Sequence, residues 1–119
     1  MSQPSPGSLV DRYVAAWTTN DHAALGAVLA PDVRAESNVG LPGRFLPLQR
    51  RLAAVATVTV VSRVDAPGRS MLIYECSTGD GGARTRVVEY LTLDDDRVSG
   101  IRHVYDIAGL ERAFPELGD

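Results

Sequence analysis

RVVEYLTLDDDRVSGIRHVYD, residues 86–106, predicts two β-strands joined by a tight acidic turn. The first strand is expected at 87–93 and the return strand at 98–106. The turn falls on Asp94 to Asp96, because aspartate adopts turn conformations and hydrogen-bonds its own backbone. This predicted hairpin is the segment from which both the fold and the site are inferred.

An acid and an imidazole occupy the apolar face of this hairpin. Side chains alternate between the two faces of a strand. Glu89 therefore shares a face with two leucines of the first strand, and His103 shares one with two large residues of the return strand. If those neighbours point into the core, Glu89 and His103 point inward with them; the neighbours are Leu91, Leu93, Ile101 and Tyr105.

Length and composition indicate one small domain that binds no nucleic acid. The chain has 119 residues and a net charge of −3, whereas a nucleic-acid surface needs clustered basic residues. No apolar run approaches the roughly 20 residues of a membrane span, so no membrane association is expected. Cys76 is the single cysteine, which excludes an intrachain disulfide and makes a reducing cytoplasm the expected location.

The remaining elements follow from periodicity and from turn residues. Residues 1–7 are interpreted as a disordered leader and residues 8–119 as the single domain. Ser8 is the predicted N-cap of the first helix, whose apolar face carries Tyr13 and Trp17. Further helices are expected at 22–30 and about 46–54, and a short amphipathic tail at 107–117. Further strands are expected at 32–38, 57–65 and 71–78, and the first hairpin strand is entered from residue 84. Loops or turns are expected at 39–43, 66–69 and 79–82.

This order predicts an α+β fold. A mostly antiparallel sheet of four or five long strands twists and curls, and the helices are expected to cover its concave face. A curled sheet that is covered in this way leaves a blind conical pocket, which is a common site for small ligands. We therefore expect a small apolar ligand or substrate in a pocket lined by Glu89 and His103.

The chain resembles the nuclear transport factor 2-like (NTF2-like) superfamily, and within it the SnoaL-like polyketide cyclases and ketosteroid isomerases. The resemblance runs from about Leu9 to Leu117. It is carried by four segments: YVAAW at 13–17, LAPDV at 29–33, ESNVG at 36–40 and VSGIRHVYD at 98–106. It implies a cystatin-like α+β barrel, a homodimer and no cofactor. Proteins of this fold differ widely in function.

The resemblance also implies roles for three residues. In ketosteroid isomerases a tyrosine on the first helix and a protonated acid on a strand form an oxyanion hole, positions that match Tyr13 and Glu89. The position of the isomerase base falls on Ser37, which is no carboxylate. We expect His103 to replace it as the base or acid, since an imidazole titrates near neutrality. His103 also occupies the place of a catalytic aspartate in the epoxide hydrolases of this fold.

Six further residues are candidates for contacting the substrate. Glu36 flanks the missing base, and a bulged strand would let it act as a second candidate base. The register of its strand decides which face it uses, and the same holds for Asn38. Trp17 also has a purely structural interpretation, core packing of the helix on the sheet. The six candidates are Trp17, Glu36, Asn38, Tyr74, Leu91 and Tyr105.

Three functions remain open from the sequence. The first is a cofactor-independent isomerase or cyclase that moves protons next to a carbonyl of a small ketone, enone or polyketide-like substrate. The second is a non-catalytic ligand-binding or accessory domain. The third is an epoxide hydrolase or epoxide-opening cyclase. No metal site is expected, because two histidines on distant elements and one cysteine do not make a ligand set. A dimer contact is expected on the outer sheet face, at Val58, Val60, Tyr90 and Val104.

Overall fold

The computed structural model describes residues 6–38, 45–80 and 82–115. Residues 1–5 of the expected leader at 1–7 and the expected loop at 39–43 lie outside these ranges, whereas residues 6 and 7 belong to the first helix. The described part contains, in chain order, α1 (Pro6–Thr18), α2 (His22–Val28), β1 (Leu29–Ser37), α3 (Phe45–Val55), β2 (Thr57–Ala66), β3 (Arg69–Ser77), β4 (Arg84–Asp94), β5 (Arg97–Tyr105) and α4 (Ile107–Ala113). None of these helices is long and apolar enough to span a membrane.

The five strands form one mixed sheet in the order β1-β5-β4-β3-β2. β1 runs parallel to β5, and the other neighbours are antiparallel. The predicted hairpin is confirmed as β4 and β5, with Glu89 directly opposite His103. Its turn contains Asp95 at a φ of 55°, a left-handed conformation that aspartate tolerates better than most residues.

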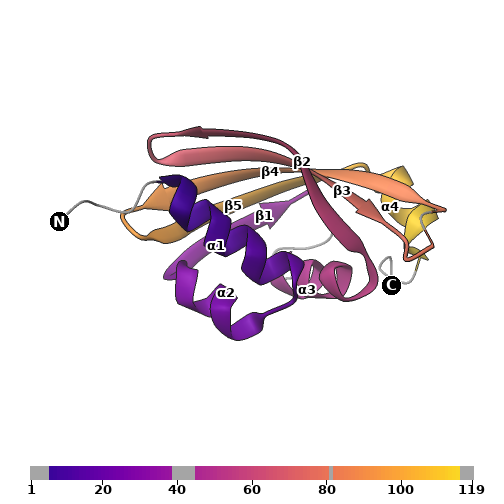
Figure 1. The fold of residues 1–119 in the computed structure, drawn as a ribbon, viewed down its shortest axis with the longest axis horizontal. Coiled ribbons are helices and arrows are strands. Elements are labelled where there is room, and N and C mark those ends of the chain that lie inside the picture. The colour runs from indigo at the N-terminus through magenta and orange to yellow at the C-terminus, as the bar shows by residue number, and fades with distance from the viewer. Residues whose placement is uncertain (1–5, 39–44, 81, 116–119) are drawn as a thin grey trace.

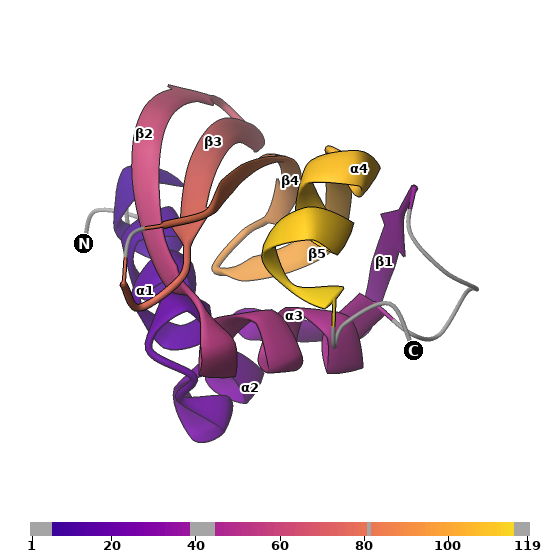
Figure 2. The ribbon, with the colours of Figure 1, turned by 90° about the vertical axis from the view of Figure 1, so that its right-hand side faces the viewer.

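The sheet curls around the helices that cover it. Figure 1 shows α1, α2 and α3 on one side of the sheet, and Figure 2 shows the strands curving around them with α4 at one end. Register shifts accompany the curl, including one between Val60 and Ser62 in β2, and bulges of this kind bend a strand and increase its twist. The predicted α+β architecture with a curved, mostly antiparallel sheet is thereby confirmed.

The core lies between α1 and the concave face of the sheet. The apolar face of α1 is buried as its spacing predicts, and it includes both Tyr13 and Trp17. Arg63 on β2 reaches over to α1 and forms an ion pair with Asp11, with 2.5 Å between Nη1 and Oδ1. This contact joins α1 to β2 just beyond the register shift between Val60 and Ser62.

Three element ends differ from the expectation. α1 begins at Pro6, before Ser8, which therefore does not cap it. Proline suits the first turn of a helix, where its missing N–H has no partner to lose. α2 ends at Val28, and β1 already includes Pro31, which was expected to stop the helix. β1 is an edge strand with a register shift between Leu29 and Arg34, and such places tolerate proline.

The prediction of which β2 side chains point away from the core is also corrected. Val58 pairs with the buried Cys76 and Val60 with the buried Tyr74, so both valines pack toward the core and not on the outer face. A strand of β-branched residues shows no alternation from which its inner face could be chosen. The large apolar residues that are exposed on the convex face include Val64, Met71 and Val104.

Candidate active site

Glu89 lies at the centre of a buried network of polar side chains. Its carboxylate is fully buried on the concave face of β4. One oxygen, Oε2, accepts a hydrogen bond from the Tyr13 hydroxyl at 2.7 Å and contacts Nε2 of His103. The other oxygen, Oε1, accepts a hydrogen bond from the Tyr74 hydroxyl. Burial of a carboxylate is costly unless hydrogen bonds replace its hydration, and here three elements, α1, β3 and β5, supply them.

His103 connects Glu89 to a third tyrosine. Its Nδ1 lies 2.8 Å from the Tyr105 hydroxyl, two residues further along β5. Two protonation states fit this arrangement. In the neutral ring Nε2–H donates to Glu89 and Nδ1 accepts from Tyr105, whereas in the imidazolium both nitrogens donate. Hydrogen bonds at both nitrogens therefore hold the ring in one orientation.

Two side chains form a second layer around the tyrosines. Trp17 donates from Nε1 to the Tyr74 hydroxyl at 3.2 Å, and its ring packs edge-on against Tyr74 with 5.0 Å between centroids. Gln49 on α3 donates from Nε2 to the Tyr13 hydroxyl at 2.8 Å. Each of these phenols thus donates to Glu89 and accepts from the second layer, which fixes the direction of both hydrogen bonds.

The phenols of the network are held neutral. Burial raises the pKa of Tyr13 and of Tyr74 well above the ordinary tyrosine value, and the charge of Glu89 raises both further. Burial raises the pKa of Tyr105 in the same way. A neutral phenol is a hydrogen-bond donor across the whole physiological range. The network therefore combines one carboxylate, one imidazole and three persistent donors, which is the equipment for proton transfer beside a developing oxyanion.

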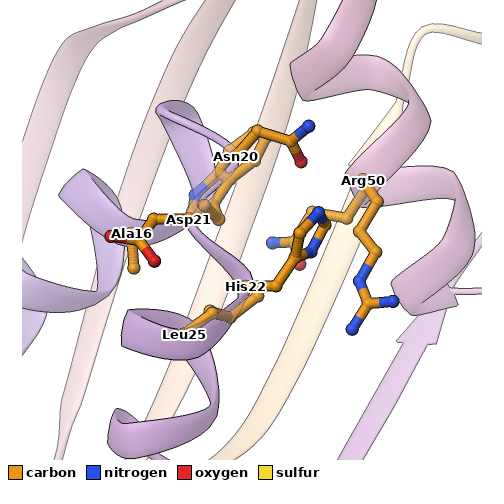
Figure 3. Close-up of a pocket in the computed structure, with 8 residues that line it drawn as sticks. Ala16, Asn20, Asp21, His22, Leu25 and Arg50 are labelled. Carbon is orange, nitrogen blue, oxygen red and sulfur yellow. The ribbon is translucent and has the colours of Figure 1, made fainter.

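The network is closed to solvent. Its acid, its imidazole, its three phenols and the Trp17 ring are each at most 3% exposed. The concave region that was expected to be hollow is filled by these side chains. A small cavity of about 10 Å³ adjoins them between the α1–α2 turn and α3 (Figure 3). Its lining includes Trp17 and Gln49.

Comparison with known proteins identifies the fold. A hypothetical protein with a ketosteroid isomerase-like fold from Catenulispora acidiphila, in complex with trimethylamine, superimposes with a TM-score of 0.66 at 19% identity, over 94% of this chain and 93% of that one. An NTF2-like protein of unknown function from Cytophaga hutchinsonii superimposes with a TM-score of 0.72 at 16% identity, over 92% and 96% of the two chains.

A candidate SnoaL-like polyketide cyclase from Jannaschia sp. CCS1 gives a TM-score of 0.73 at 14% identity, over 95% of this chain and 96% of that one. The chain has the NTF2-like fold. The resemblance drawn from the four sequence segments is confirmed at this level. No family model matches the sequence, and no curated protein does. At identities this low, the structural similarity establishes the fold of the chain alone. Its chemistry follows from its own residues.

Most of the predicted site residues meet in this NTF2-like fold. Tyr13, Trp17, Tyr74, Glu89, His103 and Tyr105 all belong to the one network. Leu91 is buried on the same face of β4, one alternation along from Glu89. Asn38 lies beside the network, and its side chain forms hydrogen bonds with the backbone of Tyr105. It donates from Nδ2 to the Tyr105 carbonyl at 2.9 Å and accepts from the Tyr105 N–H at 2.8 Å.

Glu36 is placed differently from the expectation. The parallel pairing of β1 with β5 sets Glu36 opposite Arg102, whose side chain is on the convex face. The two form an ion pair with 2.6 Å between Nη2 and Oε1. The prediction that Glu36 contacts the substrate and could act as a second candidate base is therefore wrong, because its side chain is on the far side of the sheet from His103.

Gln49 was missed by the sequence interpretation. It lies three residues before the buried Leu52 on α3, and it is itself buried. The available signal was a polar residue within the apolar face of an amphipathic helix, next to Leu52. Cys76 is also buried, and burial raises the pKa of its thiol to about 12, so it supplies no thiolate nucleophile at neutral pH.

Proposed function

We propose that this protein is a cofactor-independent acid–base enzyme, an isomerase or cyclase, that acts on a small apolar substrate with a ketone or enone group. The observation that carries the proposal is the buried contact between Glu89 and His103 on the concave face, surrounded by neutral phenols. An imidazole oriented by a carboxylate is a general base, and neutral phenols are donors for an enolate oxygen.

The proposed reaction assigns one task to each group. The substrate carbonyl oxygen takes the place of Glu89 Oε2 as the acceptor of the Tyr13 hydroxyl. The substrate displaces the partner of one ring nitrogen of His103. That nitrogen then removes a proton from the carbon next to the carbonyl. Glu89 stabilises the imidazolium that forms. The proton then returns to another carbon in an isomerisation, or the enolate carbon attacks a second carbonyl in a cyclisation and the new alkoxide takes the proton.

One feature of the closed network sets a condition on this mechanism. The hydroxyl of Tyr13 is already used by Glu89, and both ring nitrogens of His103 have partners. Substrate binding therefore has to separate the Tyr13 hydroxyl from Glu89. The same feature supports a second candidate function, a non-catalytic domain in which the satisfied network is a polar part of the core.

Turnover and binding separate the two functions. Purified wild type is assayed with a panel of cyclic β,γ-enones for conversion to the conjugated isomer, and ligand binding is followed in parallel. For the enzyme, His103→Gln lowers kcat by about 10²-fold or more while the ligand still binds. Glu75→Gln, on the outer side of β3, is the control that leaves kcat unchanged. Wild type that binds enones without converting any of them overturns the proposal in favour of the binding domain.

We also propose that a second copy packs on the convex face of the sheet. Support comes from Val64 and Met71, which pair across β2 and β3 and are 66% and 50% exposed, and from the exposed Val104. An apolar surface of this kind marks an interaction site. Sedimentation of wild type as a dimer and of Val64→Arg as a monomer supports the contact, and a monomeric wild type excludes it. The cytoplasm remains the proposed location, in keeping with the free thiol of Cys76.

A further inference from the structure

Gln49 has a buried acceptor that the network does not use. The side chain is 1% exposed, and Oε1 has no hydrogen-bond partner among the described residues. The orientation of the amide follows from its neighbour. The single hydroxyl hydrogen of Tyr13 goes to Glu89, so the Tyr13 oxygen can only accept from Gln49, which assigns Nε2 to that contact and leaves Oε1 for another donor.

The unused acceptor belongs to a residue that lines a cavity. The cavity holds about 10 Å³, which is close to the space of one water-sized group. Its lining includes the buried side chains of Trp17 and Gln49. It also includes the more exposed polar side chains of Asn20, His22 and Arg50, which Figure 3 labels. A buried acceptor is costly when it has no donor, and this cavity is of the size and polarity to admit one hydroxyl or N–H group.

Two residues that line this cavity, Gln49 and Trp17, form hydrogen bonds with the proposed catalytic network. Gln49 donates to Tyr13 and Trp17 donates to Tyr74, and each of these tyrosines donates to Glu89. A group seated in the cavity is therefore separated from the carboxylate by Gln49 and Tyr13 alone. Gln49 Oε1 and the Tyr13 hydroxyl are one amide group and one 2.8 Å hydrogen bond apart.

We infer that the cavity at Gln49 is a subsite for a hydroxyl or N–H group of the substrate, and that Gln49 determines specificity through Oε1. The inference rests on the proposed function and narrows its substrate class to ketones or enones that carry a second, donating group a few bonds from the carbonyl. A donor at Oε1 also holds the amide in the orientation that keeps the Tyr13 hydroxyl directed toward the reacting oxygen.

The test compares two probes that differ by one hydroxyl group. Binding of 4-hydroxycyclohexanone and of cyclohexanone is measured by NMR titration, with the side-chain amide signals of Gln49 as the local reporter. We expect the hydroxyketone to bind wild type at least about tenfold more tightly and to shift the Gln49 amide signals, because a site that bonds a substrate hydroxyl discriminates against the analogue that lacks it.

Two substitutions at Gln49 distinguish this role from a structural one. Gln49→Met removes the acceptor at similar size and brings the affinity ratio of the two probes to about one, whereas Gln49→Glu keeps an acceptor and retains the preference. A structural role would lower both affinities together and leave their ratio unchanged. If Gln49→Met does not fold, the ratio and the Gln49 shifts of wild type decide.

Equal affinities in wild type, or an absence of binding by both probes, overturn the inference. These readouts measure binding in the absence of turnover, so they are independent of the catalytic role of His103. His103→Gln retains the hydroxyketone preference if the subsite exists, even where the proposed reaction fails. Conversely, a catalyst that treats both probes alike keeps the proposed function and loses the subsite.

Discussion

Glu89 and His103 face each other directly across β4 and β5, and the carboxylate Oε2 contacts Nε2 of the ring with both side chains fully buried. A buried pair of this kind is strongly destabilising to break, because the remaining partner stays desolvated. The geometry thus ties a candidate proton-transfer pair to the stability of the domain. The consequences for stability and for chemistry can be measured separately.

Glu89→Ala is expected to lower the free energy of unfolding by about 3–5 kcal/mol, because it leaves His103, Tyr13 and Tyr74 without their common acceptor. Urea denaturation measures the change. Glu75→Gln is the matched control, since Glu75 is partly exposed on the outer side of β3. Its carboxylate oxygens form only long contacts, 3.7 Å from Nη1 of the exposed Arg84 and 3.8 Å from Nη2 of the exposed Arg86. We expect it to remain within about 0.5 kcal/mol of wild type. A Glu89→Ala variant as stable as this control would contradict the central position of the carboxylate.

Tyr13→Phe and Tyr74→Phe are each expected to cost about 1.5–3 kcal/mol, because each removes a hydrogen bond to a charged acceptor. Tyr90→Phe, on the outer face of β4, serves as the control and should change stability by at most about 0.5 kcal/mol. The double variant of Tyr13 and Tyr74 should deviate from the sum of the single effects, since both phenols share Glu89. Strict additivity in urea denaturation would show that the two phenols act independently.

Alkaline pH is expected to unfold the domain steeply. The folded-state pKa values of Tyr13, Tyr74 and Tyr105 are raised, and that of Cys76 is raised to about 12. Below the unfolded-state values of about 10 for tyrosine and about 8.5 for cysteine, the stability contributed by these groups is fully present. As the pH rises above those values, the unfolded chain releases protons that the folded chain retains, so the free energy of unfolding falls.

Circular dichroism and tyrosinate absorbance, recorded together against pH, check this expectation. The absorbance of the three buried phenols should appear within the unfolding transition. Ionisation of three of the four tyrosines in a chain that keeps its native circular dichroism would contradict their burial in the network.

Gly109→Ala is expected to destabilise the domain by about 1–3 kcal/mol. A Cβ at this position would lie 2.5 Å from Asp106 Oδ2 and 2.9 Å from Thr85 Oγ1, in the place where Asp106 caps α4 against β4. Gly26→Ala in α2 is the control of opposite sign. Its added Cβ meets nothing within 4 Å, so the higher helix propensity of alanine should raise stability by up to about 1 kcal/mol. Thermal unfolding of both variants measures these two opposite changes in stability.

Much of this molecule could be predicted from local patterns. Alternation along the hairpin of β4 and β5 placed Glu89 and His103 on one face, and helical spacing in α1 turned Tyr13 and Trp17 toward them. Both patterns are periodic over several residues, so one inner face is strongly preferred. The acidic turn at Asp95 also follows from local conformational preference.

The remainder depended on contacts that no local pattern records. The facing of Glu36 follows from the parallel pairing of β1 with β5, which joins residues 66 positions apart. The inward side of β2 could not be read from Val58 and Val60, because nearly every residue there is β-branched. The role of Gln49 required knowing that α3 lies against Tyr13. The closure of the network depends on the packing of four separate elements, which periodicity does not describe.

Deuterium exchange at the carbon next to a carbonyl tests the central claim most directly. Cyclohexanone and 2-cyclohexenone are incubated with the protein in deuterated buffer, and proton NMR follows the loss of the exchangeable signals. If Glu89 and His103 form a catalytic pair, wild type accelerates the exchange above the buffer rate, and His103→Gln removes about 10²-fold or more of that acceleration while Glu75→Gln retains it. Exchange at the buffer rate with wild type, or at equal rates with wild type and His103→Gln, would contradict the proposed acid–base site.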